Sequence, residues 1–377
     1  MTRISLTILV SALAIAGTAA HAEQFKTEKV AIDVTPIARG LEEPWAVEVL
    51  PDGAYIVTEK PGRLRIIRDG KLSEPITGVP DVVRNGQGGL LDVALSPDFA
   101  HDRTLFLTAS LSMKGGAGTG VIRARLSQDE SALEDVKVIF RMNKGSGKGQ
   151  HFGSRIAFGP DGMLYFSIGD RGDMTRAQDF GDHAASILRI AADGSVPKDN
   201  PFVDKAGVLP EIFSKGHRNA QGLTLDPLTG KLLTVEHGAK GGDEVNMPEA
   251  GRNYGWPVIT YGVNYNGRKI GEGTKAEGYE QPVFYWDPSI APGAVTVYRG
   301  DMFPEWRDDL LVTSLKFGLV SRLDRDAAGR ITGEERFLDG EFGRLRDIVT
   351  APDGSVLIVT DETDGQLLRI TRAGNRS

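Results

Sequence analysis

The chain of 377 residues contains no cysteine and carries no excess of positive charge. Without cysteine it cannot form a disulfide, a thiolate zinc site or a lipid-modified N-terminal cysteine. Its formal net charge of -7 argues against nucleic acid as a partner, because phosphates are neutralised by clustered Lys and Arg. No segment beyond the N-terminal one is long and apolar enough to span a bilayer, so we expect no membrane insertion.

A continuous apolar run lies at the N-terminus, in MTRISLTILVSALAIAGTAAHAEQF. Arg3 precedes the run, which extends from Ile4 to about Ala16, and the small-residue sequence AHA at 20–22 is typical of a cleavage site. We therefore expect residues 1–22 to be a secretory signal peptide and the mature protein to be periplasmic. A membrane anchor would need about 20 apolar residues in a row, and this run is shorter.

The sequence does contain a repeat. A turn followed by an alternating apolar strand occurs in LPDGAYIVTE, SPDFAHDRTLFLTA, GPDGMLYFSIGD, DPLTGKLLTVEH, FPEWRDDLLVTSL and APDGSVLIVTDE. A short apolar strand precedes most copies and another follows several, and Asp-Gly or Pro-Asp turns favour tight hairpins. Amphipathic helical periodicity is nearly absent. This pattern predicts an all-β, six-bladed β-propeller with four-stranded antiparallel blades.

We expect a single propeller domain over residues 25–373, because a closed ring leaves no natural linker. The segment VAIDVTPIARGL alternates like a strand but has no meander of its own. It is expected to supply the outer strand of the last blade and so to close the ring. The stretch NYGWPVITYGVNYNGRKIGEGTKAEGYEQP is rich in Gly and aromatic residues, and we expect it to form an inserted loop over one face.

Polar side chains recur just before the first strand of four units, which is the strand nearest the propeller axis. These residues are His151, Gln87, Arg218, Asn219, Arg344 and Arg346. Because equivalent positions of different blades meet around the axis, we expect them to line one pocket. The arginines together with Lys316 suit carboxylate or phosphate groups, which predicts a polyanionic ligand. A neutral His151 could act there as a general base, with Asp170 orienting its ring; the alternative is that each is an ordinary loop residue.

The segment EHGAKGGDEVN, residues 236–246, is dense in hard oxygen donors. Asp243, Glu244 and carbonyls exposed by glycine suit calcium, although the spacing is not that of an EF-hand and a solvated turn is the alternative. The chain has no two-histidine zinc spacing, no P-loop and no glycine-rich motif that opens a helix. Zinc and nucleotide cofactors are therefore poorly supported.

Several motifs, taken in order, resemble the soluble pyrroloquinoline-quinone (PQQ)-dependent sugar dehydrogenases, especially the bacterial aldose sugar dehydrogenases. They are GQGGLLDVALSPDF, HFGSRIAFGPDGMLYFSIGD, GHRNAQGL, EHGAKGGDEVN, GRNYGWP, PSIAPGA, TSLKFGLVSRL and RLRDIVTAPDG. The resemblance runs from about residue 40 to 370. It implies a propeller that binds PQQ and Ca2+ on its axis and oxidises aldoses at C1 to the lactone, with hydride transfer to the quinone.

The resemblance also implies a role for individual positions. His151 corresponds to the base that takes the proton of the C1 hydroxyl, Asp170 to the carboxylate that holds it, and Arg218 to the group that stabilises charge on the quinone oxygen. The positions lining the cofactor and its carboxylates are Gln87, Arg218, Asn219, Ser289, Lys316, Arg344 and Arg346. The metal positions are Gly238 and Ala239, whose carbonyls would bind the cofactor's calcium, and Glu244 and Tyr254, at a second, structural calcium site.

Two positions depart from the family pattern. Ala239 stands where proline is frequent, and it preserves the backbone carbonyl that the calcium would contact. Ser154 stands where a second glycine is frequent, and we expect its hydroxyl to lie beside the base and to narrow or repolarise the sugar site.

Two other functions are open at this point. A calcium-dependent propeller lactonase or hydrolase would need an axial cage of Asp, Glu and Asn, and it has no use for Lys316, Arg344 and Arg346 together. A non-catalytic ligand-binding propeller would be expected to lack His151 or Arg218. As partners we expect a small aldose and a soluble or membrane-linked electron acceptor, with the chain a monomer or a homodimer.

Overall fold

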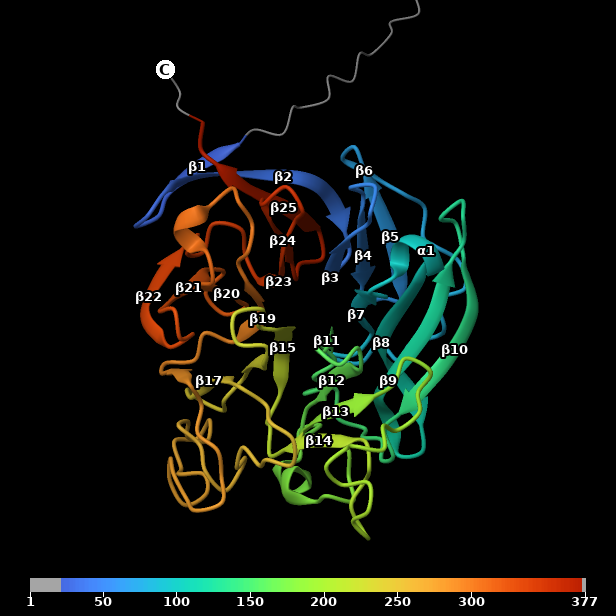
Figure 1. The fold of residues 1–377 in the computed structure, drawn as a ribbon, viewed down its shortest axis with the longest axis vertical. Coiled ribbons are helices and arrows are strands. Elements are labelled where there is room, and N and C mark those ends of the chain that lie inside the picture. Colours follow the sequence, from blue (N-terminus) through green and yellow to red (C-terminus); the bar gives the residue numbers. More distant parts are fainter. Residues whose placement is uncertain (1–21, 375–377) are drawn as a thin grey trace, which may run out of the picture.

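Six antiparallel sheets are arranged around a common centre in the computed structural model, which describes residues 22–374 (Figure 1). The predicted signal peptide, residues 1–22, lies outside the described residues apart from Ala22. Helix is confined, within the described part, to α1 (Phe99–Asp102) and the 3-10 turns η1 (Met174–Gln178) and η2 (Pro304–Trp306). None of the described helices is long and apolar enough to cross a membrane. The predicted six-bladed all-β propeller is confirmed.

The first three blades follow chain order, and neighbouring strands in each are hydrogen-bonded. Blade one contains β3 (Pro44–Val49), β4 (Tyr55–Glu59), β5 (Arg63–Arg68) and β6 (Lys71–Leu72). Blade two contains β7 (Leu90–Leu95), β8 (Thr104–Met113), β9 (Gly116–Leu126) and β10 (Leu133–Arg141). Blade three contains β11 (Ile156–Phe158), β12 (Leu164–Ile168), β13 (Ser186–Ile190) and β14 (Ile212–Lys215).

The next two blades repeat this pattern, and the sixth combines both ends of the described chain. Blade four contains β15 (Ala220–Leu225), β16 (Leu232–Glu236), β17 (Asp243–Asn246) and β18 (Phe284–Trp286). Blade five contains β19 (Pro292–Val297), β20 (Leu310–Ser314), β21 (Val320–Arg325) and β22 (Ile331–Phe337). Blade six contains β23 (Leu345–Thr350), β24 (Val356–Thr360), β25 (Gly365–Arg372), β2 (Ala31–Leu41) and β1 (Glu23–Lys26).

The sixth sheet has one strand more than the four that the repeat predicts. The segment VAIDVTPIARGL forms β2, which pairs antiparallel with β25, and the register sets Val34 opposite Ile370. Side chains of β2 alternate between buried and half-buried, as expected for a strand with one face on the core, and Ile32 and Val34 are fully buried. The short strand β1 pairs with the outer edge of β2.

The first strands of the blades surround the axis. β3, β7, β11, β15, β19 and β23 contact one another in turn, and β23 contacts β3. Apolar side chains fill the space between adjacent blades; Trp45 and Leu64 of blade one, for example, belong to one cluster with Leu91 and Leu107 of blade two. Because the strands of a blade are antiparallel, the beginning of each first strand and the end of each second strand lie at the same end of the axis.

The predicted inserted loop joins β17 to β18. Its residues Tyr261, Val263 and Tyr265 line the cavity at the end of the axis where the first strands begin. The loop therefore covers the face on which the candidate site lies.

Candidate active site

A cavity of about 860 Å³ lies where the first strands of the blades begin and the second strands end. Of the residues predicted to bind a cofactor or its calcium, it is lined by Gln87, Ala239, Ser289, Lys316, Arg344 and Arg346. Of the residues predicted to meet in one pocket, Gln87, Lys316, Arg344 and Arg346 line this cavity, whereas His151, Arg218 and Asn219 are not among its lining residues. Its size suits a ligand of the dimensions of a tricyclic cofactor together with a small substrate.

Positive side chains gather in this cavity. Arg346 is 5% exposed, donates to Gln221 Oε1 at 2.8 Å and pairs with Asp361 Oδ2 at 2.6 Å. Lys60 approaches the other carboxylate oxygen of Asp361 at 2.8 Å. Burial acts to raise the pKa of Asp361, but the charges of Arg346 and Lys60 outweigh it and hold that pKa well below its usual range. Asp361 is therefore an anion, which offsets only part of the positive charge.

Lys316, Arg344 and Ser289 complete this side of the cavity. Lys316 Nζ donates to the Ser289 carbonyl at 3.1 Å and has no carboxylate partner among the described residues. Arg344 donates to the Leu315 carbonyl at 3.1 Å and lies 3.3 Å from Asp361 Oδ2. The exposed ammonium and guanidinium groups retain donors that a bound anion can accept.

His151 and Asp170 form a hydrogen-bonded pair. His151 Nδ1 lies 2.6 Å from Asp170 Oδ1, and the His151 backbone N–H donates to Gln87 Oε1 at 2.7 Å. Asp170 follows β12, whereas His151 precedes β11, so antiparallel pairing of these two strands brings the residues together. His151 Nε2 has no hydrogen-bond partner among the described residues. With Nδ1–H donating to a carboxylate, Nε2 is left as the proton acceptor.

The environment keeps the pair in the charge states of a base and its orienting anion. Burial lowers the pKa of His151, the hydrogen bond to Asp170 opposes this, and the charge of Arg218 lowers it further. Burial would raise the pKa of Asp170, but the hydrogen bond from His151 and the charge of Arg218 bring it below its usual value. Asp170 also accepts from the Gly172 N–H at 2.7 Å and from Trp256 Nε1 at 2.9 Å.

Arg218 and Asn219 lie next to this pair. The Arg218 carbonyl accepts the Asp170 N–H at 2.9 Å, and its guanidinium lies 5.2 Å from the ring centre of Trp256. Arg218 donates to the His237 carbonyl at 3.1 Å, and its Nε is buried without a partner among the described residues. Asn219 is fully buried, and its Oδ1 accepts a hydrogen bond from the Gly153 N–H at 3.1 Å. Its Nδ2 has no hydrogen-bond partner within the described residues. The three predicted catalytic residues, His151, Asp170 and Arg218, therefore lie next to one another. Arg218 Nε and Asn219 Nδ2 are buried donors that have no partner among the described residues.

The backbone at Gly238 is packed too tightly for a side chain. A Cβ at this position would lie 2.1 Å from the Gly241 carbonyl oxygen, so the turn requires glycine. Asp243 accepts the Gly238 N–H at 2.8 Å, the Ser289 hydroxyl at 2.7 Å and the Ala291 N–H at 2.7 Å. Asp243, one of the oxygen donors that the sequence analysis considered for calcium, connects the Gly238 turn to the Ser289 loop.

Glu244 and Tyr254 line a second cavity of about 10 Å³, which Glu236 also lines. This volume suits a single water molecule or ion. The carboxylates of Glu236 and Glu244 both accept from Asn246 Nδ2, at 2.8 Å and 3.0 Å, and Asn246 Oδ1 is buried without a partner among residues 22–374. Burial and then repulsion from Glu236 raise the pKa of Glu244. No cluster of three or more His, Cys, Asp or Glu side chains suited to a metal occurs in the described part of the chain.

Ser154 does not have the position expected for it. It is fully buried, and its hydroxyl donates to the Phe152 carbonyl at 3.1 Å. It does not line the 860 Å³ cavity. Its φ of 81° lies in the left-handed region, which suits the glycine common at this position and turns the side chain into the core. The burial and the bond to Phe152 do not support the expectation that this hydroxyl repolarises the sugar site.

Several cavity residues were not expected from sequence, and they share a position in the fold. Lys60, His237 and Asp361 each follow the second strand of a blade, as Asp170 and Lys316 do. Burial and the charge of Arg218 lower the pKa of His237 to about 3, so this imidazole is neutral. A search for polar residues after every second strand, as well as before every first strand, would have found them.

Comparison with known proteins identifies the family of this chain. Residues 41–369 match the glucose/sorbosone dehydrogenase family. Aldose sugar dehydrogenase YliI of Escherichia coli is 41% identical over 347 residues, covering 90% of this chain and 93% of that protein. Quinoprotein glucose dehydrogenase B of Acinetobacter calcoaceticus is 28% identical over 423 residues, covering 91% of this chain and 88% of that protein. The structure of the PQQ-bound aldose sugar dehydrogenase from Streptomyces coelicolor has a TM-score of 0.75 at 28% identity, covering 94% of this chain and 99% of that one. Because the match extends over nearly the whole described chain, this protein belongs to the glucose/sorbosone dehydrogenase family.

Proposed function

We propose that this protein is a PQQ- and calcium-dependent aldose dehydrogenase that oxidises the C1 hydroxyl of an aldose to the lactone. The observation that carries the proposal is the hydrogen-bonded His151–Asp170 pair, which Gln87 joins to a cavity rich in cations. The sugar dehydrogenases among its relatives support the reaction class. The N-terminal sequence supports a periplasmic location, with a soluble or membrane-linked protein as the electron acceptor.

The side chains of the cavity fit PQQ, which carries three carboxylates. Five cationic side chains line the cavity against three carboxylates: Lys60, Lys240, Lys316, Arg344 and Arg346 against Glu43, Asp287 and Asp361. Arg346 Nε is buried without a partner among the described residues, and a carboxylate would satisfy such a donor. When bound, PQQ would accept the hydride from C1, and its calcium would act as a Lewis acid on the quinone.

The proton is the part of the reaction that this chain's own residues handle. His151 Nε2 takes the proton of the C1 hydroxyl, because Nδ1 is committed to Asp170. Asp170 holds the imidazole in this orientation and stabilises the imidazolium that forms. Trp256 and the Gly172 N–H bind the same carboxylate and keep it ionised. Arg218, which has no carboxylate partner among the described residues, supplies positive charge for an oxygen that becomes negative.

We assign the cofactor's calcium to the carbonyls of Gly238 and Ala239. The tight turn at Gly238 and the presence of Ala239 in the cavity wall support this assignment. A second calcium would be held by Glu244 and the segment at Tyr254. The unpaired Asn246 Oδ1 and two adjacent buried carboxylates, all within the described residues, form a donor set that a hard cation suits. No specific observation favours a lactonase, which has no use for Lys316, Arg344 and Arg346 together, or a non-catalytic propeller, which would be expected to lack His151 or Arg218.

Reconstitution of the whole protein tests the proposal. Apo-protein should oxidise aldoses with an artificial dye acceptor only when PQQ and calcium are both added. His151→Asn should keep its affinity for PQQ and lose turnover, whereas His101→Asn, at an exposed histidine in blade two, should behave like the parent. Turnover without PQQ, or near-normal turnover by His151→Asn, would refute the assignment.

A further inference from the structure

Arg171 is a buried cation with an unusual set of partners. Its side chain is fully buried, and no carboxylate pairs with it among the described residues. Burial lowers its pKa to about 9, so it still carries its charge at neutral pH. A buried charge without an ion-pair partner is costly unless polar groups solvate it, so the groups that do so are informative.

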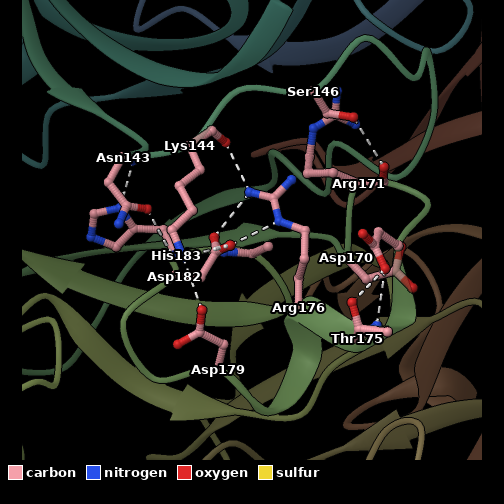
Figure 2. A network of polar contacts seen from close by, with 12 residues as sticks. Asn143, Lys144, Ser146, Asp170, Arg171, Thr175, Arg176, Asp179, Asp182 and His183 are labelled. Carbon is pink, nitrogen blue, oxygen red and sulfur yellow. Dashed lines mark hydrogen bonds and ion pairs between the residues drawn. The ribbon is translucent and has the colours of Figure 1, made fainter. Parts of the chain in front are cut away.

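These groups all belong to the segment that contains His151. The Arg171 guanidinium donates to the Gln150 carbonyl and, at 3.0 Å, to the Lys148 carbonyl. Its central carbon lies 3.4 Å from the ring centre of Phe152. Figure 2 shows Arg171 next to Asp170 on one loop. The Arg171 carbonyl accepts a hydrogen bond from the Ser146 hydroxyl at 3.5 Å. Arg171 therefore contacts the chain on both sides of His151.

The backbone of His151 needs such support. Its φ is 55°, in the left-handed region that residues other than glycine seldom adopt. Backbone in this region persists where surrounding contacts hold it, and here those contacts come from Gln87 at the His151 N–H and from Arg171 at the preceding carbonyls. Two adjacent residues therefore fix the position of His151, since Asp170 binds its imidazole and Arg171 binds the main chain beside it.

We propose that Arg171 is a positioning residue for the base, holding residues 148–152 so that the His151 imidazole meets Asp170. The proposal rests on the proposed function only in naming His151 as the base. The planar guanidinium can hold two carbonyls and stack on a ring at once, which a lysine ammonium cannot do.

The charge of Arg171 gives the proposal a second consequence. The ionisable groups facing His151 are Asp170, whose hydrogen bond raises the imidazole pKa, and Arg218 and Arg171, whose charges lower it; His237 is a neutral neighbour. Both an uncharged residue and lysine at position 171 should weaken the Asp170 hydrogen bond, which raises the His151 pKa in the parent, so the pKa should fall in Arg171→Lys. Because methionine also removes a charge that lowers this pKa, the His151 pKa should be higher in Arg171→Met than in Arg171→Lys.

Arg103 provides a matched control. Its guanidinium donates to the Leu126 carbonyl at 3.0 Å and the Ser127 carbonyl at 2.9 Å, and lies 5.9 Å from the ring centre of Phe99. It makes the same carbonyl and ring contacts as Arg171, in blade two and outside the cavity, and differs in pairing with Glu130 at 3.7 Å. Arg103→Met should change neither the His151 pKa nor turnover.

The experiment combines an NMR titration of apo-protein with kinetics after reconstitution with PQQ and calcium. The His151 signal is identified by its loss in His151→Asn. Arg171→Lys should lower the His151 pKa, move the acidic limb of kcat/KM to lower pH and lower kcat by about 10- to 100-fold. Arg171→Met should lower kcat by a similar factor, with a His151 pKa above that of Arg171→Lys.

The proposal is overturned if both Arg171 variants keep kcat within about twofold of the parent. It is also overturned if the His151 pKa of Arg171→Lys equals that of the parent, because the Asp170 hydrogen bond is then intact without Arg171. If Arg171→Met does not fold, Arg171→Lys alone decides. A general loss of structure would lower both kcat and PQQ affinity, whereas a displaced His151 lowers kcat and leaves PQQ affinity unchanged. If the parent itself does not oxidise aldoses, the proposed function fails, while the NMR titration still tests what Arg171 does to His151.

Discussion

Asp170→Asn is the substitution for which the structure allows the most complete prediction. The Asp170 carboxylate accepts three hydrogen bonds, from His151 Nδ1 at 2.6 Å, the Gly172 N–H at 2.7 Å and Trp256 Nε1 at 2.9 Å. All three neighbours are donors. An amide presents one oxygen and one NH2 group, so in either orientation its NH2 must face an N–H.

The expected cost has two parts. A buried donor that faces another donor costs about 1–3 kcal/mol of folding free energy. The base also loses the anion that fixes its tautomer and stabilises the imidazolium, for which a fall in kcat of about 10²- to 10⁴-fold is expected. The PQQ affinity should change little, because Asp170 does not line the cavity.

The pH dependence of the stability difference follows from the lowered pKa of Asp170. A carboxyl whose folded pKa lies below the usual 3.8 adds stability that is present at higher pH and is lost as the pH falls through the folded pKa. The parent should therefore lose this advantage over Asp170→Asn in acid. Denaturant unfolding at neutral and acidic pH measures this difference.

Asp173→Asn is the matched control, because Asp173 lies on the same loop but binds only the backbone and hydroxyl of Thr175. Its kcat should remain within about twofold of the parent. Turnover of Asp170→Asn equal to that of Asp173→Asn would refute the account of the dyad.

Three further predictions follow from the site. The acidic limb of kcat/KM should lie below pH 6.5, because burial lowers the pKa of His151; a pH–rate profile with its limb above that value would contradict this. Trp256→Phe removes one hydrogen-bond donor to Asp170 and should lower kcat about tenfold at unchanged PQQ affinity. Trp286→Phe removes a hydrogen bond of 2.9 Å to the remote carboxylate of Glu334 and should leave kcat unchanged. Arg346→Met should weaken PQQ binding at least about tenfold by calorimetry, as expected for a lost charged hydrogen bond; unchanged affinity would disprove the carboxylate clamp.

The fold could be predicted because its signals are local. A turn and an alternating strand recur within each unit, and LLDVAL, for example, corresponds to β7 residue for residue. The strand β1 could not be predicted in this way, because four residues, Glu23–Lys26, are too few to establish a pattern. Its pairing with β2 depends on the edge that β2 leaves open, which is a property of the assembled sheet.

The site could be predicted only where position in the repeat determined it. Gln87 and Arg346 were found because they lie at the start of first strands, whereas Lys60 and Asp361, at the ends of second strands, were missed. The direction of the Ser154 side chain depends on a φ of 81°, which the residue type alone does not reveal. Trp256 reaches Asp170 from an insertion 86 residues away, and no spacing in the sequence indicates that contact.

An anaerobic absorbance titration tests the central claim most directly. Apo-protein is titrated with PQQ and calcium, and a panel of aldoses is then added while the absorption of the bound oxidised cofactor is followed. The account predicts saturable binding and loss of that absorption with at least one aldose in the parent, and binding without that loss in His151→Asn. An absorption that no aldose changes, or that His151→Asn loses as fast as the parent, would contradict it.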